Sequence, residues 1–181
     1  AYVKLIYEEE LIAQPGAQYH YSNLGFILIY HLLEKVMNKP YDQVLDSMFF
    51  QPYQMSHTKD IHRQLPGERF VFGYKKDDAS GGIVQGNVSW NQIFRSGDWT
   101  STARDLHRFL EKSKNIPGLF ENDSLQHGGA TSGYRAYIFH AQKSGQKVIF
   151  LSNYANIPFI KIAEDISNIL NGEKVEMPEL L

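Results

Sequence analysis

The last third of the chain constrains the fold most, because two strand-like runs flank a short turn and a helix follows them. Residues 134–142 and 147–152 are rich in β-branched and aromatic side chains. Residues 143–146, Lys-Ser-Gly-Gln, have the composition of a hairpin turn. Pro158 then opens a run in which apolar residues recur every three or four positions until Gly172. A hairpin with a helix to cover it predicts an antiparallel sheet and an α+β fold.

The part of the chain before this hairpin is predicted to be mostly helical. Apolar residues recur at helical spacing over residues 24–37, 41–50 and 103–113. Thr102, with Asp105 three positions later, resembles a capping box at a helix N-terminus. A short helix over residues 1–11 and a strand over residues 69–75 complete the prediction. We therefore expect a mostly helical region with irregular loops over residues 1–125, and a hairpin with its covering helix over residues 126–181.

The composition argues against several classes of function. The formal net charge is -2, so a nucleic-acid or anionic-membrane partner has no support from a basic surface. The longest apolar run, Phe26 to Leu33, falls well short of the roughly 18 residues that span a bilayer. There are no cysteines, which excludes disulfides and thiolate ligands. The histidines show no His-Glu-x-x-His spacing, and we expect neither a metal nor another cofactor.

Tyr21-Ser22-Asn23 is the first segment with the residue types that chemistry needs. A tyrosine and an asparagine two positions apart in an extended stretch can point to one side. A phenol can move a proton, and an amide can both donate to and accept from a substrate. The structural alternative is that Asn23 caps the following helix while Tyr21 packs on it. Taken alone, this segment favours the structural interpretation.

A second such segment, His127 to Tyr134, directly precedes the first strand run. Glycines beside a strand let a ligand or another backbone approach closely. A free N–H at that place could serve as an oxyanion donor, and His127 could present a donor or a positive charge. The structural alternative is a glycine-rich connection with an incidental histidine, and the segment alone again favours it.

Together these segments resemble the β-lactamase-related serine hydrolases, the group of class C β-lactamases, penicillin-binding proteins, DD-peptidases and esterases. Residues 15–26 resemble that family's Pro-Gly…Tyr-Ser-Asn-x-Gly run. Residues 50–58, 101–109 and 127–134 resemble its next three motifs, in the same order. The resemblance covers about residues 13–170 and implies part of a β-lactamase/transpeptidase-like fold.

The resemblance implies a role for individual residues. Tyr21 would shuttle a proton to and from the nucleophile, and Asn23 would hold the acyl-side amide of the substrate. His127 would support Tyr21 or the polar end of the substrate. Ala130 would offer its backbone N–H as one half of the oxyanion hole. Gly128 and Gly129 would keep that strand edge accessible, and Ser22 would need no role.

The family's nucleophile, the serine of a Ser-x-x-Lys helix upstream of Tyr-x-Asn, has no counterpart here. The residues before Tyr21 contain no serine. Ser144 and Lys147 match the spacing, but they follow the His-Gly-Gly segment and are predicted to lie in the hairpin turn. We therefore expect the missing N-terminal part of the same protein to carry the nucleophile, and this chain alone to be inactive.

Two functions stay open at this point. The first is part of a serine acyl hydrolase that forms an acyl-enzyme on an amide, ester or β-lactam, with a small-molecule or peptide-like substrate. The second is a non-catalytic module of the same fold that binds a peptide-like ligand or a partner. The resemblance implies an exported, periplasmic or extracellular protein. The aromatic residues Trp90, Phe94 and Trp99 could line a substrate groove or cover the core.

Overall fold

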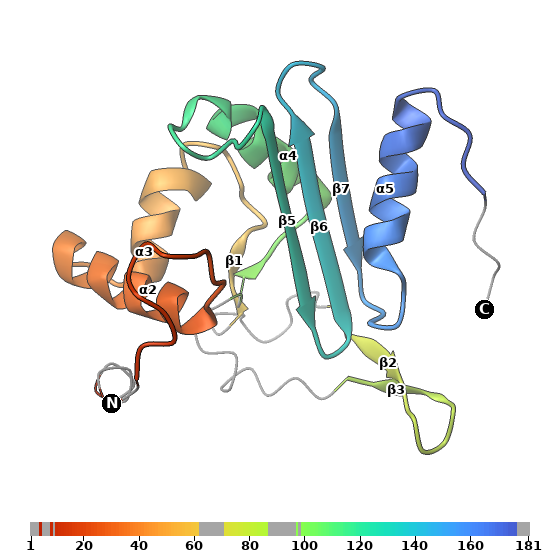
Figure 1. Cartoon of the computed structure of the whole chain (residues 1–181), viewed down its shortest axis with the longest axis horizontal. Helices are drawn as coiled ribbons and strands as arrows, with labels where there is room; N and C mark the ends of the chain where they lie inside the picture. Colours follow the sequence, from red (N-terminus) through yellow and green to blue (C-terminus); the bar gives the residue numbers. More distant parts are fainter. Residues whose placement is uncertain are drawn as a thin grey trace.

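The computed structural model describes residues 4, 8, 10–61, 71–86, 97 and 99–176. A helical region, a three-stranded sheet and a C-terminal helix follow one another across the molecule (Figure 1). The structure is α+β, as the sequence predicts. Of the predicted helix over residues 1–11, all but four positions lie outside the described residues.

The central sheet is an antiparallel meander in the order β5-β6-β7. Its strands are β5 (Ser124–Thr131), β6 (Tyr134–Ala141) and β7 (Lys147–Ser152). Thr131 pairs with Tyr134 across a turn whose second residue, Gly133, has φ +99°. A side chain is strained at that φ, so glycine suits the position. The predicted hairpin of β6 and β7 is confirmed, with Gly145 at φ +72° in its turn.

One helix packs on each face of this sheet. Neighbouring residues of a strand point to opposite faces. On β6, Tyr137 interacts with Glu164 of helix α5 (Phe159–Leu170), whereas His140 contacts the backbone of Leu110 on helix α4 (Ala103–Lys112). Tyr137 and His140 are three positions apart and therefore face opposite ways. The predicted helices at both places are confirmed.

The helical region begins with α2 (Asn23–Met37), which ends at Asn38 in the left-handed conformation. Next come α3 (Tyr41–Leu45) and a π-helical turn over Asp46–Phe50, so the predicted helix over residues 41–50 is present but widens in its second half. The Glu34 carboxylate joins α2 to α3, because it accepts hydrogen bonds from the Tyr30 hydroxyl and the Tyr41 N–H, both at 2.9 Å.

Trp99 is half-buried and packs on aromatic side chains of the helical region. It lies on β4 (Trp99–Thr100), which pairs with β1 (Lys59–Asp60). Its ring meets Phe50 edge-on at 5.0 Å and Tyr41 at 6.0 Å between ring centroids. Trp90 and Phe94, which the sequence groups with it, lie outside the described residues.

The fully buried carboxylate of Asp105 connects the helical region to the sheet. It accepts hydrogen bonds from the His57 N–H at 2.7 Å and the Thr58 hydroxyl at 3.1 Å, and Arg108 donates to it at 3.2 Å. The Asp105 N–H donates to the Thr102 hydroxyl oxygen, so the predicted helix cap is confirmed. Because α4 packs on β7, this carboxylate holds the loop before β1 against the sheet.

A small hairpin, β2 (Tyr74–Lys76) and β3 (Ile83–Gln85), projects from one end of the sheet (Figure 1). It is attached through Tyr74, whose N–H donates to Asn153 and whose carbonyl accepts from Ala155, each at 2.8 Å. The strand predicted over residues 69–75 begins only at Tyr74 within the described residues, so its predicted start is wrong for residues 71–73. A methyl group on Gly73 would meet the Tyr134 ring at 2.5 Å, and only glycine fits that approach.

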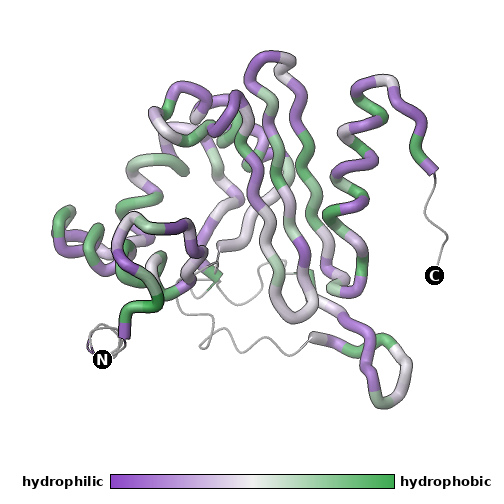
Figure 2. The backbone as a smooth tube through the Cα atoms, viewed as in Figure 1, coloured by the Kyte–Doolittle hydropathy of each residue, from purple (hydrophilic) through white to green (hydrophobic). Residues whose placement is uncertain are grey.

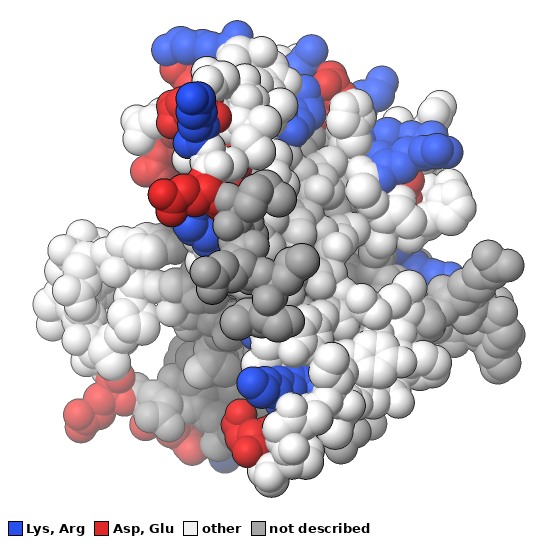
Figure 3. All heavy atoms as spheres, turned by 90° about the vertical axis from the view of Figure 1, so that its right-hand side faces the viewer, with Lys and Arg blue, Asp and Glu red and all other residues white. Residues whose placement is uncertain are grey.

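No described helix has the length and apolar character that crossing a membrane requires. On the face shown in Figure 3, Lys and Arg side chains lie among Asp and Glu side chains over the upper part of the visible described surface.

We predict that Asp105→Ala lowers the free energy of unfolding by about 2–4 kcal/mol, because the His57 N–H and the Thr58 hydroxyl lose their buried acceptor. Urea unfolding followed by circular dichroism measures the change. Asp78→Ala, at an exposed turn position, is the control and should leave the midpoint in place. Equal stability of the two variants would contradict this account of the core.

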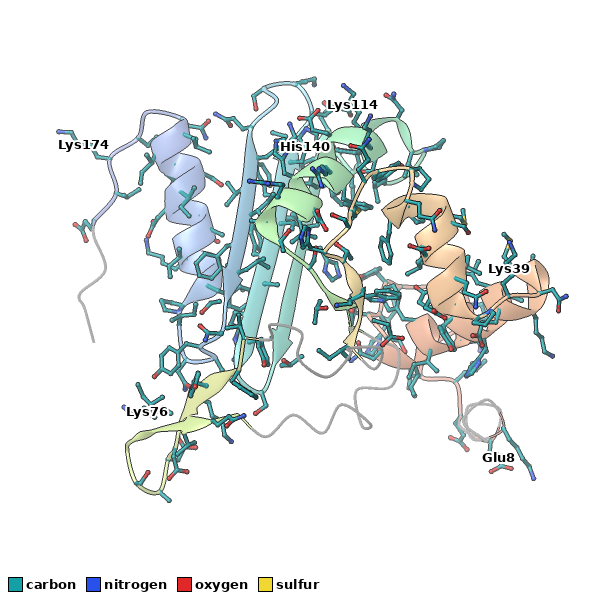
Figure 4. The ribbon with its side chains drawn as sticks, turned by 180° about the vertical axis from the view of Figure 1, so that it is seen from behind. Glu8, Lys39, Lys76, Lys114, His140 and Lys174 are labelled. Atoms are coloured by element: carbon teal, nitrogen blue, oxygen red, sulfur yellow. The ribbon has the colours of Figure 1, made fainter. Side chains whose placement is uncertain are left out.

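We also predict that the protein loses stability below about pH 6.5 through His140, which is buried on the α4 face of β6 (Figure 4). Burial lowers the pKa of His140 below its ordinary value of 6.5; Lys147 and Lys114 act in the same direction, and Glu111 and the Leu110 carbonyl oppose them. The unfolded chain therefore binds a proton at a pH where the folded chain does not, and acid favours unfolding.

The urea midpoint should accordingly fall between pH 7.5 and pH 5.5, and His140→Phe should reduce that fall. His107→Gln, at an exposed position of α4, should keep the pH dependence of the parent chain. An unchanged pH dependence in His140→Phe would refute the assignment.

Candidate active site

The Tyr21-Ser22-Asn23 segment forms the N-terminus of α2, and Ser22 is its cap. The Ser22 hydroxyl accepts a hydrogen bond from the Gly25 N–H at 3.1 Å, and Ser22 has extended dihedrals. Asn23 is the first helical residue, so the structural interpretation that assigned the cap to Asn23 is wrong by one position. Ser22, expected to need no role, has a structural one. A serine just before an apolar helix was the available signal.

Tyr21 packs on Phe26, with ring centroids 5.5 Å apart. These residues flank the cap at the positions of a hydrophobic staple, which fixes the direction in which the chain enters the helix. The Tyr21 side chain is still 48% exposed. Neither its hydroxyl nor the Asn23 amide bonds to another described residue. Both polar groups therefore face outward, with cap and staple holding the backbone beneath them.

The backbone of β5 alternates between bonding β6 and facing the open edge of the sheet. Thr131 and Tyr134 close a two-residue turn and must be a hydrogen-bonded pair. Every second residue back along β5 is then bonded as well, which leaves Ala130, Gly128 and Gln126 with N–H and C=O groups pointing away from β6. The Ala130 N–H thus faces an edge of the sheet that no other described strand covers, as an oxyanion donor requires.

Neither glycine of β5 is required by its described surroundings. A methyl group on Gly128 would make an ordinary contact with the Phe159 ring of α5, at 3.4 Å. A methyl group on Gly129 would make an ordinary contact with Ala136, at 3.6 Å, on the opposite face. Packing within the described residues therefore does not account for either glycine.

His127 shares the face of Gly129 and is exposed. Near the turn, Arg135 donates from Nη1 to the carbonyl oxygens of Thr131, at 2.8 Å, and Tyr134, at 2.7 Å. Its guanidinium also lies 5.9 Å from the Phe159 ring centroid. Arg135 therefore fixes the end of β5 next to Ala130, a role that the sequence analysis did not identify.

The structure brings His127, Gly128, Gly129 and Ala130 together on one strand, and Tyr21 with Asn23 at one helix end. No hydrogen bond or ion pair joins the helix end to the strand within the described residues. In the view of Figure 1, the loop before α2 lies between that helix and β5. The described chain thus presents two groups of candidate residues on separate elements.

Three other places in the described chain could be considered as catalytic or metal sites, and none of them groups suitable residues. Ser144 and Lys147 lie in and after the β6–β7 turn, where Lys147 pairs with Glu111 at 2.6 Å. The described residues contain no group of three His, Asp or Glu side chains that could hold a metal ion. A shallow hollow beside the start of β5 contains none of the candidate residues; its lining is Leu119, Glu121, Asn122, Ser124, Leu125 and Gln126.

Comparison with known proteins shows which proteins this chain is similar to. The staphylococcal protein flp (Staphylococcus aureus, strain MW2) is 18% identical over 94% of this chain and 40% of its own length. The octameric penicillin-binding protein homologue from Pyrococcus abyssi superposes with a TM-score of 0.75 at 20% identity, over 90% of this chain and 45% of that one. A D-amino acid amidase from Ochrobactrum anthropi SV3, complexed with L-phenylalanine amide, superposes with a TM-score of 0.75 at 18% identity. The superposition covers 94% of this chain and 64% of the amidase chain.

The two solved structures share the fold of this chain, and the chain spans less than two thirds of the length of all three proteins. The family model described as Beta-lactamase matches residues 1–128, which is more than half of the sequence and includes Tyr21, Asn23 and His127. The chain therefore belongs to the beta-lactamase family.

Proposed function

We propose that this chain supplies the proton-transfer and oxyanion groups of a serine acyl hydrolase that forms an acyl-enzyme on an amide, an ester or a β-lactam. The observation that carries the proposal is the Ala130 N–H, which faces the open edge of β5. Membership of the beta-lactamase family supports serine acyl hydrolase chemistry. The nucleophile comes from a preceding part of the same protein, and the 181-residue chain alone is inactive.

In the proposed reaction the serine oxygen attacks the carbonyl carbon of the substrate while its proton passes to the Tyr21 oxygen. The carbonyl oxygen becomes an anion, and the Ala130 N–H donates to it. Tyr21 then protonates the leaving group as the tetrahedral intermediate collapses to the acyl-enzyme. Asn23 holds the acyl-side amide, and His127 supports Tyr21 or the polar end of the substrate. The outward position of the Tyr21 hydroxyl suits this transfer, because cap and staple fix only its ring and backbone.

The open edge of β5 favours an extended, peptide-like substrate. Gly128 and Ala130 both direct N–H and C=O groups away from β6. An added strand can pair with such groups while its side chains occupy neighbouring pockets. Gly129 between them adds no side chain on the His127 face. The family also supports an exported protein, which cell fractionation would check.

We predict that a fluorescent fluorophosphonate labels the longer gene product but not the 181-residue chain. In the longer product, Tyr21→Phe should slow labelling by about 10²–10⁴-fold, because proton transfer from the serine loses its acceptor. The ring and its contact with Phe26 remain, so the stability should not change. The labelling rate is measured by stopping the reaction at a series of times and reading the fluorescence of the protein band on a gel.

Two outcomes would contradict this part of the proposal. Rapid labelling of the 181-residue chain would show that it holds its own nucleophile. An unlabelled longer product that still binds peptide-like ligands would favour the non-catalytic binding module.

A second prediction concerns the Ala130 N–H alone. Ala130→Pro removes this donor but no bond to β6, and an edge strand tolerates proline where the N–H faces outward. Labelling of the longer product should fall by about 10²–10³-fold, the usual effect of losing one oxyanion donor. Gln126→Pro removes another outward N–H four residues away and is the matched control. Equal rates in the two variants would remove Ala130 from the site.

A further inference from the structure

The open edge of β5 is closed at its start by the chain that precedes this strand. Ser124 faces the same edge as Ala130, but its N–H donates to the Glu121 carbonyl at 2.9 Å and its carbonyl accepts from the Glu121 N–H at 2.8 Å. The backbone groups of Gln126, the next outward residue, have no partner on this side within the described residues. The edge with which a ligand can pair therefore runs from Gln126 to Ala130, about 14 Å of extended chain.

A hollow of about 220 Å³ lies at this closed end, between the start of β5 and the preceding chain. Phe120 contacts the His140 ring on the α4 face of the sheet, with ring centroids 5.2 Å apart. Successive side chains of an extended chain point to opposite faces, so Glu121 points the other way and lines the hollow. A ligand strand on the open edge thus reaches Glu121 where the edge ends.

The turn beside this hollow is fixed to the sheet. Asn122 and Asp123 have φ of +49° and +63°, as the two-residue turn of a hairpin requires. The Asp123 carbonyl accepts from the Gln142 N–H at 2.8 Å, and its carboxylate forms an ion pair with Lys143. The backbone of Glu121 is therefore held in place before a ligand binds, which lowers the entropy cost of binding.

The groups around the hollow suit a primary ammonium on an aliphatic stem. The lining contains no cationic side chain, and the exposed Glu121 carboxylate forms no ion pair within the described part of the chain. An ammonium has three N–H donors, which match this carboxylate and the amide oxygen of Asn122. Leu119 and Leu125 supply apolar surface for the stem. Figure 2 shows a hydrophilic stretch in the first half of β5 and pale colours toward its end, so the polar surroundings lie on the side of the hollow.

We propose that this hollow is a subsite for a primary ammonium group of a peptide-like substrate that lies along the edge of β5. This inference rests on the proposed function, because the Ala130 N–H places the reacting carbonyl on that edge. The Glu121 carboxylate accepts the N–H groups of the ammonium about 14 Å away, beyond Gln126. Glu121 is thus a specificity residue, remote from the bonds that change. A lysine-like side chain and a free α-amino terminus share the required chemistry.

Alanine pentapeptides test the subsite by their binding to the longer gene product. Each is capped at both ends and carries lysine or norleucine at one end and a dye at the other. Norleucine keeps the aliphatic stem and lacks the charge. Fluorescence anisotropy gives the dissociation constants. We expect the lysine peptide to bind about three- to five-fold more tightly, the upper range for an exposed ion pair, and salt should reduce the difference.

Two further sets of peptides identify the source and the direction of the ligand. A norleucine peptide with a free α-amino group tests whether a chain terminus replaces the lysine side chain. Peptides with lysine at the N-terminal or at the C-terminal end show in which direction the ligand strand runs along β5, because only one of them places the ammonium in the hollow.

Glu121→Gln should abolish the preference for lysine and leave the binding of the capped norleucine peptide unchanged, because it removes the charge and keeps the backbone bonds to Ser124. Glu173→Gln, at an exposed position outside the lining, is the matched control and should keep the preference. A preference that survives Glu121→Gln, equal binding of all peptides by the parent protein, or no binding of any peptide would overturn the proposal.

The anisotropy readout does not depend on catalysis. A product that prefers lysine through Glu121 but resists the fluorophosphonate would keep the subsite and lose the hydrolase. A product that the fluorophosphonate labels but that shows no preference would keep the hydrolase and lose the subsite.

Discussion

The buried carboxylate of Asp105 is the interaction on which the arrangement of this molecule depends. By accepting hydrogen bonds from His57 and Thr58, this carboxylate joins the start of α4 to the loop before β1, and Arg108 also donates to it. Helix α4 in turn packs on the sheet. A buried carboxylate is stable only when donors surround it, so His57, Thr58 and Arg108 must hold their positions. Together with the Arg108 bond to the Gln54 carbonyl and the pairing of β1 with β4, this connection helps to place the candidate residues of the helical region relative to those of β5.

Local signals predicted most of the regular structure. Helical spacing of apolar residues predicted α2, α4 and α5, and β-branched runs predicted β6 and β7. Strand β5 has few local strand signals, because Gly128, Gly129 and Ala130 have low strand propensity. Their pairing with β6 makes them a strand. Thr102 and Asp105 predicted the helix cap, but the Asp105 bonds to His57 and Thr58 span more than forty residues, beyond what local spacing shows.

The sequence could propose a set of site residues but not their arrangement. Motif resemblance proposed Tyr21, Asn23 and the β5 residues, and their roles stay a prediction. Which groups face outward depends on hydrogen-bond register and on the cap at Ser22, and neither is visible in spacing alone. Arg135 was missed for the same reason, because its partners are backbone carbonyl groups and a ring that only the folded sheet brings near.

The meander of β5, β6 and β7 with α5 also has a consequence for the order of folding. These elements follow one another over residues 124–170 and are joined by short loops, so their contacts close small segments of chain. Closing a short segment of chain costs little conformational entropy, so contacts between such neighbours form fast. The contact of Asp105 with His57 must close a far longer loop. We therefore expect the C-terminal sheet to form early on its own and then to serve as the surface on which the helical region condenses.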